Sequence, residues 1–391
     1  MTDHVDTMTP RERLLTAVDH REPDRIPIDL GGNQTGIHKF AYETLIRHLG
    51  LSEEIEIMDA VQQLARPSEA VLERLRVDTR YIHAGAASDF DGAITATDRD
   101  GKRWHDLIDE FGIRWSMPDD SPLYMDITLH PLANATIDDV KAYPFPRGDD
   151  PGRFAGLRDK ALQIRNETPY AVVSGISGVV YEICWYMRGL ERWFMDMMDQ
   201  PEFCEALIDR TLKFWIDWFR LFLAEVGDIV DVIMIGDDIA GQRGPLFHPE
   251  FYRSVVKPRQ KQLVQFIKSR TRAKIWYHTC GACKRYIPDL LDNGIDIINP
   301  VQISATDMDP TELKSAFGEQ LSFWGGAIDA QHVLPHADPE TVREHVQRNI
   351  RTLMPCGGYV FNNVHNIQAG IPPENVLAMY DAAYEFGRYG R

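Results

Sequence analysis

The sequence lacks three features that would place the protein outside the cytoplasm. Only five of its 391 residues are cysteines, and they are too scattered to form a disulfide framework. No apolar run approaches the roughly 20 residues that a membrane-spanning helix needs. Residues 1–10 are polar and contain no apolar signal core. We therefore expect a cytoplasmic protein that neither spans a membrane nor binds one.

Positively charged residues are also fewer than negatively charged ones. The chain has 42 lysine and arginine residues against 59 aspartate and glutamate residues, which gives a formal net charge of −17. Because nucleic acids and anionic membranes are themselves negative, an acidic surface argues against both as partners. A local basic site for a small anion remains compatible with this balance. The hydrophobic fraction of 44% is sufficient for a well-filled core.

What the sequence has is a regular alternation of short apolar segments with helical segments. Eight apolar segments are expected to be strands: Asp24–Leu30, Thr79–His83, Tyr170–Ser174, Asp228–Ile235, Ile275–Tyr277, Asp296–Pro300, Leu321–Gly325 and Gly358–Asn362. A helical pattern follows each one, which predicts parallel strands joined by crossover helices. Eight such units favour a closed (β/α)8 TIM barrel, with residues 1–391 as one domain, over the alternative of an open doubly wound sheet.

Two segments depart from this alternation. A helix from Thr9 to about His20 precedes the first strand, and Glu12 can close a capping box with Thr9. Residues 89–132, after the second strand, contain the turn Asp98-Arg-Asp-Gly101 between two alternating segments, which predicts a β-hairpin. We interpret this excursion as a lid or an interface.

Side chains that bind metals follow the predicted strand ends. His278 and Cys280 lie at the end of the fifth strand, where residues two apart point to the same side. An imidazole and a thiolate aimed at one point are two of the ligands that zinc uses. His365, after the eighth strand, is the third candidate, because barrel strand ends open on one face. The alternatives are a buried cysteine with a hydrogen-bonding histidine, or a redox or zinc pair of Cys280 with Cys283.

Other polar residues follow the strands in the same way. Asp237 and Arg243 are predicted to be catalytic, as a general base and a clamp for a substrate carboxylate. The alternatives are an N-capping aspartate and an arginine that merely pairs with an aspartate. For the aromatic residues, the alternative to contacting an aromatic substrate is ordinary core packing. Candidate substrate-binding residues are Asn33, Asp238, Gln302 and Trp324.

Together these segments resemble the uroporphyrinogen decarboxylase superfamily and, within it, the branch of zinc-dependent, corrinoid-linked methyltransferases. The motifs are Thr9-Pro-Arg-Glu-Arg-Leu14, Asp24-Arg-Ile-Pro27, Gly236-Asp-Asp-Ile239, Gln242-Arg-Gly-Pro245, Tyr277-His-Thr-Cys-Gly281, Asn299-Pro-Val-Gln302, Phe323-Trp-Gly-Gly326, Val364-His-Asn-Ile-Gln368 and Pro372-Pro-Glu-Asn375. The resemblance covers nearly the whole chain and implies a (β/α)8 barrel. It is specific for the superfamily and not for a substrate.

Two departures from the family pattern decide which activity the resemblance implies. The decarboxylases carry a Met-Arg-Gln-Ala-Gly-Arg segment that grips porphyrin carboxylates, whereas Leu30-Gly-Gly-Asn-Gln-Thr35 contains no arginine. Porphyrinogen decarboxylation is therefore not expected. The methyltransferases hold zinc with a His-x-Cys pair, matched by His278 and Cys280, and with a later cysteine, where this chain has His365. Gln302 stands at the position of an acidic residue. Three ligands and one open position is the arrangement of catalytic zinc.

The resemblance thus implies a zinc-dependent methyltransferase. The methyl group would move between a small substrate, with aromatic O-methyl compounds among the candidates, and a corrinoid protein or a thiol or folate acceptor. The implied cofactors are zinc and a corrinoid carried by a partner protein, and a homodimer is a further expectation. Two alternatives stay open: a metal-independent decarboxylase or lyase that uses Asp237, Arg243 and His365, and a non-catalytic protein that binds a small molecule.

Overall fold

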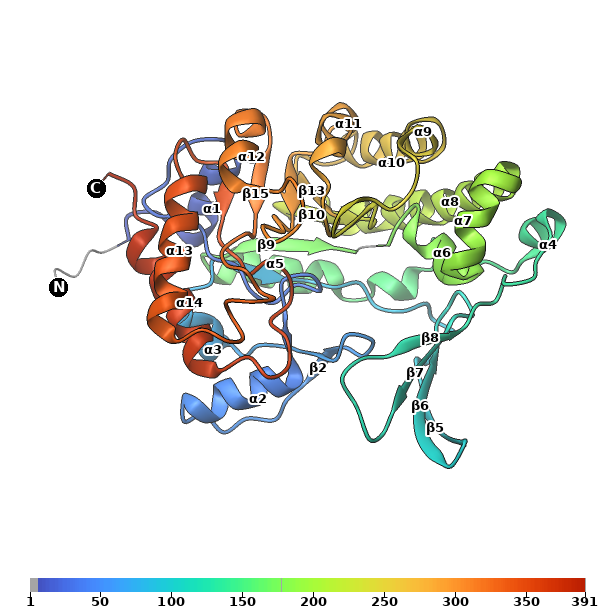
Figure 1. The fold of residues 1–391 in the computed structure, drawn as a ribbon, viewed down its shortest axis with the longest axis horizontal. Helices are drawn as coiled ribbons and strands as arrows, with labels where there is room; N and C mark the ends of the chain where they lie inside the picture. The colour runs from blue at the N-terminus through green and yellow to red at the C-terminus, as the bar shows by residue number, and fades with distance from the viewer. Residues whose placement is uncertain (1–5, 177, 391) are drawn as a thin grey trace.

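The centre of the molecule is a parallel sheet that curls into a barrel (Figure 1). The computed structural model describes residues 6–176 and 178–390. In spatial order the seven strands are β16 (Tyr359–Val360), β15 (Ser322–Trp324), β14 (Ile297–Asn299), β13 (Lys274–His278), β10 (Val232–Gly236), β9 (Ala171–Gly175) and β4 (Thr79–Tyr81). Read from β4 to β16, this spatial order is also the order along the chain, since each strand is joined to its neighbour by a crossover connection.

The predicted first strand, Asp24–Leu30, closes the ring between β16 and β4. Ile28 forms a parallel bridge with Phe361, whose N–H donates to the Pro27 carbonyl at 2.8 Å. On the other side, the Asp78 N–H donates to the Ile28 carbonyl, also at 2.8 Å. The segment forms isolated bridges instead of a continuous strand, in part because Pro27 has no N–H to donate. The predicted TIM-barrel-like α/β fold is confirmed.

Helices surround the barrel in the order that the sequence predicts. They include α2 (Lys39–His48), α3 (Glu69–Arg74), α4 (Ile137–Ala142), α5 (Leu157–Glu167), α6 (Glu182–Arg188), α7 (Leu190–Asp199), α8 (Pro201–Val226), α9 (Pro249–Phe251), α10 (Lys257–Lys268), α11 (Ile287–Asn293), α12 (Pro310–Phe317), α13 (Pro339–Leu353) and α14 (Pro373–Phe386). Gly189 separates α6 from α7, and α8 begins at Pro201. Within the described part of the chain, no helix combines the length and apolar character needed to cross a membrane.

The N-terminal helix α1 (Pro10–Val18) closes one end of the barrel. Its capping box is formed as predicted, with Thr9 and Glu12 exchanging hydrogen bonds. Leu14 is fully buried on this helix and packs in a cluster with Trp276 and Trp324, which stack inside the barrel with ring centroids 4.5 Å apart. The barrel interior is therefore a packed core at this end, and binding chemistry is confined to the opposite mouth.

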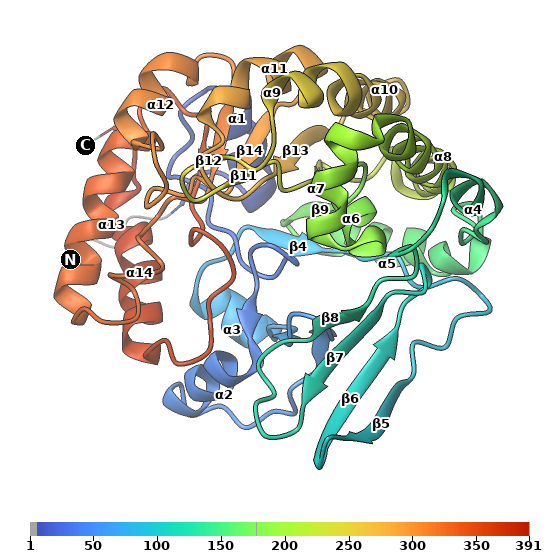
Figure 2. The same cartoon turned by 45° about the vertical axis from the view of Figure 1, so that its right-hand side comes forward.

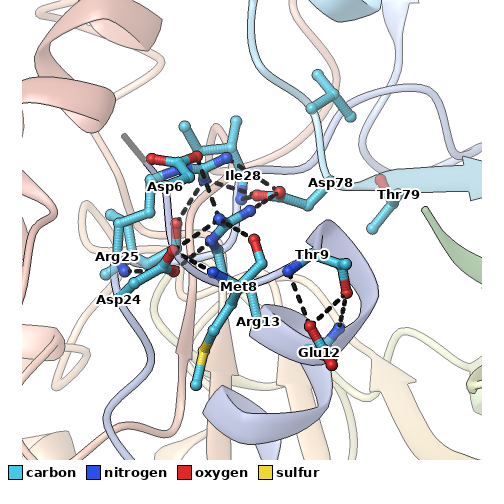
Figure 3. A network of polar contacts seen from close by, with 12 residues as sticks. Asp6, Met8, Thr9, Glu12, Arg13, Asp24, Arg25, Ile28, Asp78 and Thr79 are labelled. Atoms are coloured by element: carbon cyan, nitrogen blue, oxygen red, sulfur yellow. Dashed lines mark hydrogen bonds and ion pairs between the residues drawn. The ribbon is translucent and has the colours of Figure 1, made fainter. Parts of the chain in front are cut away.

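A buried ion network fastens α1 to the barrel (Figure 3). Arg13, only 1% exposed, donates to Asp24 at 2.7 Å and to Asp78 at 2.5 Å. Arg25 also donates to Asp78, at 2.7 Å. Each charge is thus compensated by a partner, as burial requires. This network explains physically why the Thr9–Leu14 and Asp24–Pro27 motifs occur in the sequence.

The excursion between β4 and α4 forms a separate antiparallel sheet (Figure 2). Its strands are β5 (Ile94–Arg99), β6 (Lys102–Ile108), β7 (Arg114–Pro118) and β8 (Asp126–Leu129). The predicted hairpin is β5 and β6, and β8 is an additional strand. The strand β7 begins at Arg114, after a turn in which the Asp109 carboxylate accepts from the N–H groups of Phe111 and Ile113. We name this four-stranded unit the inserted sheet.

Candidate metal centre and active-site cavity

Three metal-binding side chains meet at the mouth of the barrel. β13 ends at His278, Cys280 follows two residues later, and His365 lies beyond β16. Their candidate ligand atoms all lie within 4.8 Å of one another. Cys280 Sγ is 3.5 Å from His278 Nε2, and the two imidazole rings are 5.3 Å apart. The structure therefore brings the three predicted ligands together, and we call them the metal triad.

The chemistry and spacing of the metal triad fit a zinc ion. Zn–S bonds of about 2.3 Å and Zn–N bonds of about 2.0 Å, at a tetrahedral angle, separate sulfur from nitrogen by roughly 3.5 Å. The Sγ–Nε2 distance of 3.5 Å agrees with this separation. Burial lowers the pKa of His278 to about 4 and that of His365 to about 3, so both imidazoles are neutral at pH 7 and keep a lone pair. Burial raises the pKa of the Cys280 thiol, an effect that a cation opposes because it stabilises the thiolate.

Asn299 at the end of β14 orients the first histidine. Its Oδ1 lies 2.6 Å from His278 Nδ1, and its own Nδ2 donates to the Trp324 carbonyl at 3.0 Å. Because the side chain is held in this orientation by its amide donor, its oxygen accepts the Nδ1 proton. The lone pair of Nε2 is then directed to the side of Cys280. Such a hydrogen bond fixes the tautomer and orientation of a metal-binding histidine.

Replacement of Asn299 by leucine is expected to weaken zinc binding by about 10–100-fold, because loss of the partner that orients a ligand typically has this effect. Competition with a chromophoric chelator measures the affinity directly. Asn349→Leu is the matched control, since Asn349 is also buried and donates to a backbone carbonyl, that of Ala327, but belongs to α13. Equal zinc affinity in wild type and Asn299→Leu would contradict the orienting role.

Two acidic side chains lie next to the metal triad. Asp238 Oδ1 accepts from the Cys280 N–H at 2.7 Å, and Glu182 Oε2 accepts from the Asp238 N–H at 3.4 Å. Tyr186 donates to the other oxygen of Glu182 at 2.5 Å. Burial raises the pKa of both carboxyl groups, and for Glu182 the nearby Asp238 raises it further. The two groups therefore provide a place for a proton beside the metal triad.

Asp237 does not face this site, contrary to the prediction of a catalytic base. Its carboxylate is fully buried and accepts from the N–H groups of Val180, Tyr181 and Glu182 at 2.8–3.0 Å. Gln260 donates to its other oxygen at 3.1 Å. Burial raises the pKa of Asp237 to about 6, but every oxygen is already engaged. Asp237 caps the start of α6, and we correct its assignment from catalytic to structural.

Arg243 is also displaced from its predicted place. It lies in the turn between the two short strands β11 (Ala240–Gly241) and β12 (Gly244–Pro245). Its side chain is exposed and does not line the cavity at the metal triad. A clamp on a substrate in that cavity is therefore not available from Arg243, and its predicted catalytic role is corrected.

The four predicted substrate-binding residues divide into two groups. Asn33 and Asp238 line the cavity. Gln302 instead accepts from the Gly281 N–H at 2.7 Å, which supports the loop that carries Cys280. Trp324 is fully buried in the barrel, where its Nε1 donates to Asp29 at 2.9 Å, so its assignment is corrected to core packing.

A cavity of about 460 Å³, which we call the metal-side cavity, opens beside the metal triad. His278, His365, Asp238 and Glu182 line it, and so does Trp115 of the inserted sheet. Glu182 and Trp115 are absent from the predicted site, because in the sequence they resemble an ordinary acid of a first helical turn and an ordinary strand residue. A wider groove of about 1330 Å³, bordered by Lys274 at the other end of β13, contains no member of the metal triad.

A closed α/β barrel with two histidines and a cysteine at one mouth defines a protein of the TIM-barrel class with a candidate metal site. The family model for uroporphyrinogen decarboxylase (URO-D) matches residues 106–386, more than half of the chain. The protein therefore belongs to the uroporphyrinogen decarboxylase family of enzymes.

Similar proteins place this membership in context. The uroporphyrinogen decarboxylase of Alkalilimnicola ehrlichii is 24% identical over 387 residues, which cover 96% of this chain and 93% of that protein. The one from Methylococcus capsulatus is 26% identical over 227 residues, or 55% of this chain and 60% of its own. A methyltransferase from Methanosarcina mazei superimposes with a TM-score of 0.62 at 17% identity, covering 97% of this chain and 99% of its own, which shows a common fold.

Proposed function

We propose that the protein is a zinc-dependent methyltransferase that moves a methyl group between a small substrate and a corrinoid protein or a thiol acceptor. The observation that carries this proposal is the convergence of His278, Cys280 and His365 at the barrel mouth, where the two histidines line the metal-side cavity. The inserted sheet borders this mouth, so it also frames the surface on which a corrinoid protein would dock. The methyltransferase fold of the Methanosarcina mazei protein is consistent with the proposal.

The residues of the site have separate tasks in this reaction. His278, Cys280 and His365 would hold the metal, with His278 oriented by Asn299. When bound, zinc supplies Lewis acidity that makes an oxygen, nitrogen or sulfur atom a better leaving group or a better nucleophile. The Cys280 N–H bond to Asp238 fixes the backbone that presents the thiolate. Glu182 reaches the same cavity and can give a proton to the heteroatom that loses its methyl group.

A decarboxylase is the second candidate, because the curated relatives are uroporphyrinogen decarboxylases. The charge of the metal-side cavity argues against a substrate with many carboxylates. Four carboxyl side chains line it, those of Asp59, Asp109, Glu182 and Asp238. Among the residues that the structure describes, its wall has neither lysine nor arginine. Such a wall repels a polyanion and has no cation to bind it.

The test compares two cysteines of one sequence motif. Cys280→Ala removes a metal ligand, whereas Cys283→Ala alters a buried thiol that lies 3.9 Å from the Met308 sulfur. With free cob(I)alamin as the acceptor and a panel of O-, N- and S-methyl donors, the absorbance of methylcobalamin reports transfer. We expect Cys280→Ala to lose more than about a hundredfold in rate, since loss of a ligand exceeds loss of its supporting partner.

Cys283→Ala should retain both zinc and most of the transfer rate. A wild type that releases carbon dioxide from a carboxylated substrate without bound metal would support the decarboxylase instead. A wild type with zinc but no chemistry toward any donor or carboxylate would support the third possibility, a binding protein. Equal transfer rates in Cys280→Ala and Cys283→Ala would overturn the metal-dependent proposal.

A further inference from the structure

A wide groove of about 1330 Å³, which we call the basic groove, lies at the end of the barrel opposite the metal triad. Asp231, just before β10, and Lys274, the first residue of β13, are part of its wall. His278 of the metal triad is the last residue of the same strand. At about 3.3 Å per residue, the two ends of β13 are roughly 13 Å apart. The basic groove is therefore separate from the site of the proposed methyl transfer.

The wall of the basic groove is positively charged, although the protein as a whole is acidic. Seven lysine and arginine side chains line it, against four carboxylates. The whole chain, in contrast, carries a formal net charge of −17. At physiological ionic strength, exposed charges more than about 8 Å apart are largely screened from each other. The local excess of cations therefore sets the potential inside the groove, and this potential attracts anions.

Three of the seven cations are arginines that the fold itself uses. Arg11 of α1 and Arg165 of α5 both pair with Asp231, each at 3.0 Å, and the Asp231 side chain is only 4% exposed. Arg158 of α5 pairs with Asp228 at 2.9 Å. Because a nearby cation compensates each of these two carboxylates, they repel an entering anion only weakly.

The unpaired positive charge lies on the segment that joins α10 to β13. This segment, Lys268-Ser-Arg-Thr-Arg-Ala-Lys274, has a cation at every second position, and all four cations line the groove. The two lysines each pair with an aspartate, at 2.9 and 2.7 Å. Arg270 and Arg272 are exposed, and neither forms an ion pair with any residue that the structure describes. Two arginines thus line the groove without a carboxylate partner.

Contacts within the protein hold this segment in place before a ligand arrives. The Arg270 guanidinium lies over the Phe266 ring, 3.8 Å from its centroid, and its Nη1 donates to the Ser269 hydroxyl at 2.7 Å. Thr271 donates to the Gly227 carbonyl at 2.6 Å, which ties the segment to the end of α8. Because the segment is already ordered, it loses less conformational entropy when a ligand binds.

The side chains of the groove select the chemistry of the anion. Arginine presents parallel N–H donors that fit phosphate and carboxylate groups. A phosphate group offers three acceptor oxygens, so it bridges neighbouring cations better than a carboxylate with two oxygens does. No aromatic residue is among the described residues of the wall, and a nucleobase would therefore have no ring to stack on. Linked phosphate groups without a base fit these features best.

We propose that the basic groove binds a small polyphosphate anion, with two or more linked phosphate groups and no aromatic base, through Arg270 and Arg272. Lys268 and Lys274, on either side of the two arginines, add positive charge to the same wall. This binding site is independent of the proposed function, because neither the metal triad nor a methyl group takes part in it.

Calorimetric titration of the full chain with tripolyphosphate tests the two arginines. We expect the double variant Arg270→Gln, Arg272→Gln to bind the probe more than about tenfold more weakly than the wild type, since it loses charge-assisted hydrogen bonds. Arg351→Gln is the matched control, because Arg351 is an exposed arginine in the last turn of α13 and does not line the groove. Equal affinities of the double variant and the control, or no binding to the wild type, overturn the proposal.

A metal ion at the triad is itself able to bind a polyphosphate, and Cys280→Ala controls for this. Because Cys280 lies at the other end of the barrel, this variant should bind tripolyphosphate as the wild type does. An affinity that is lost in Cys280→Ala but kept in the double arginine variant places the probe at the metal triad and overturns the assignment to the groove. A zinc-free protein that binds the probe through the two arginines supports this proposal and contradicts only the metal-dependent function.

Two further probes test the class of the ligand. ATP carries the same triphosphate with a nucleoside, and tetraglutamate carries carboxylates instead of phosphates. We expect ATP to bind no more tightly than tripolyphosphate, since its base has no ring to stack on. Tetraglutamate should bind at least about tenfold more weakly, because each carboxylate offers fewer acceptor oxygens. Much tighter binding of ATP would identify a nucleotide site, and tighter binding of tetraglutamate would identify a docking site for an acidic peptide. Either result overturns the proposed ligand class.

Discussion

His365→Ala will contain much less zinc than the wild type when both are purified without added metal. The wild type should carry about one zinc ion per chain, held by three protein ligands. The variant keeps only His278 and Cys280, and two ligands do not hold zinc against dilution. Loss of one ligand should lower the affinity by more than about a hundredfold, since even a supporting residue contributes 10–100-fold. Elemental analysis of the two proteins measures the difference.

The matched control is His332→Ala. His332 is an exposed histidine after β15 and pairs with Asp329 at 3.0 Å, apart from the metal triad. It should retain the zinc of the wild type, which shows that removal of any histidine is not sufficient. The melting temperature of each variant checks that the fold is intact. A wild type that stays free of zinc even after zinc is added would end the metal-dependent proposal.

Arg13→Ala is expected to lower the free energy of unfolding by roughly 3–5 kcal/mol, the usual effect of removing one partner from a buried ion pair. The change takes away the hydrogen bonds to Asp24 and Asp78 and a further one of 2.8 Å to the Met8 carbonyl. It leaves Asp24 buried without its main cation, and Asp78 with Arg25 alone. Unfolding in guanidinium chloride, followed by tryptophan fluorescence, measures the change.

Arg47→Ala provides the contrast. Arg47 forms an exposed pair with Glu43 at 2.8 Å on α2, and such pairs contribute no more than about 1 kcal/mol to stability.

The effect of Arg13→Ala on stability should also depend on pH. Partial burial raises the pKa of Asp24, but the hydrogen bonds from Arg13 and from the Met8 and Thr7 N–H groups outweigh it and hold the pKa well below its usual 3.8. The stabilisation is therefore present above pH 4 and lost as the pH falls. A loss no larger than that of Arg47→Ala would contradict the role of the network.

The proximity of His278, Cys280 and His365 could be predicted from where each residue stands relative to a strand. His278 and Cys280 stand two residues apart at the end of an apolar segment, and barrel topology brings the end of β16, near His365, to the same mouth.

Asp237 and Asp238 show what the sequence could not predict. They are neighbours in sequence, yet Asp238 faces the cavity while Asp237 turns toward the start of α6. Adjacent residues of an extended segment point to opposite sides, and only the packed structure shows which side is the site.

The sequence by itself determined the barrel, the N-terminal helix and the hairpin, because these depend on hydrophobic periodicity, capping residues and turns within short windows. It also placed His278, Cys280 and His365 at one mouth of the barrel, because each of them follows a strand. Only the tertiary structure decided that Trp324 belongs to the core, that Glu182 lines the metal-side cavity, and that the inserted sheet supplies part of the wall of that cavity. These outcomes depend on contacts between segments far apart in the chain, about which a local pattern carries no information.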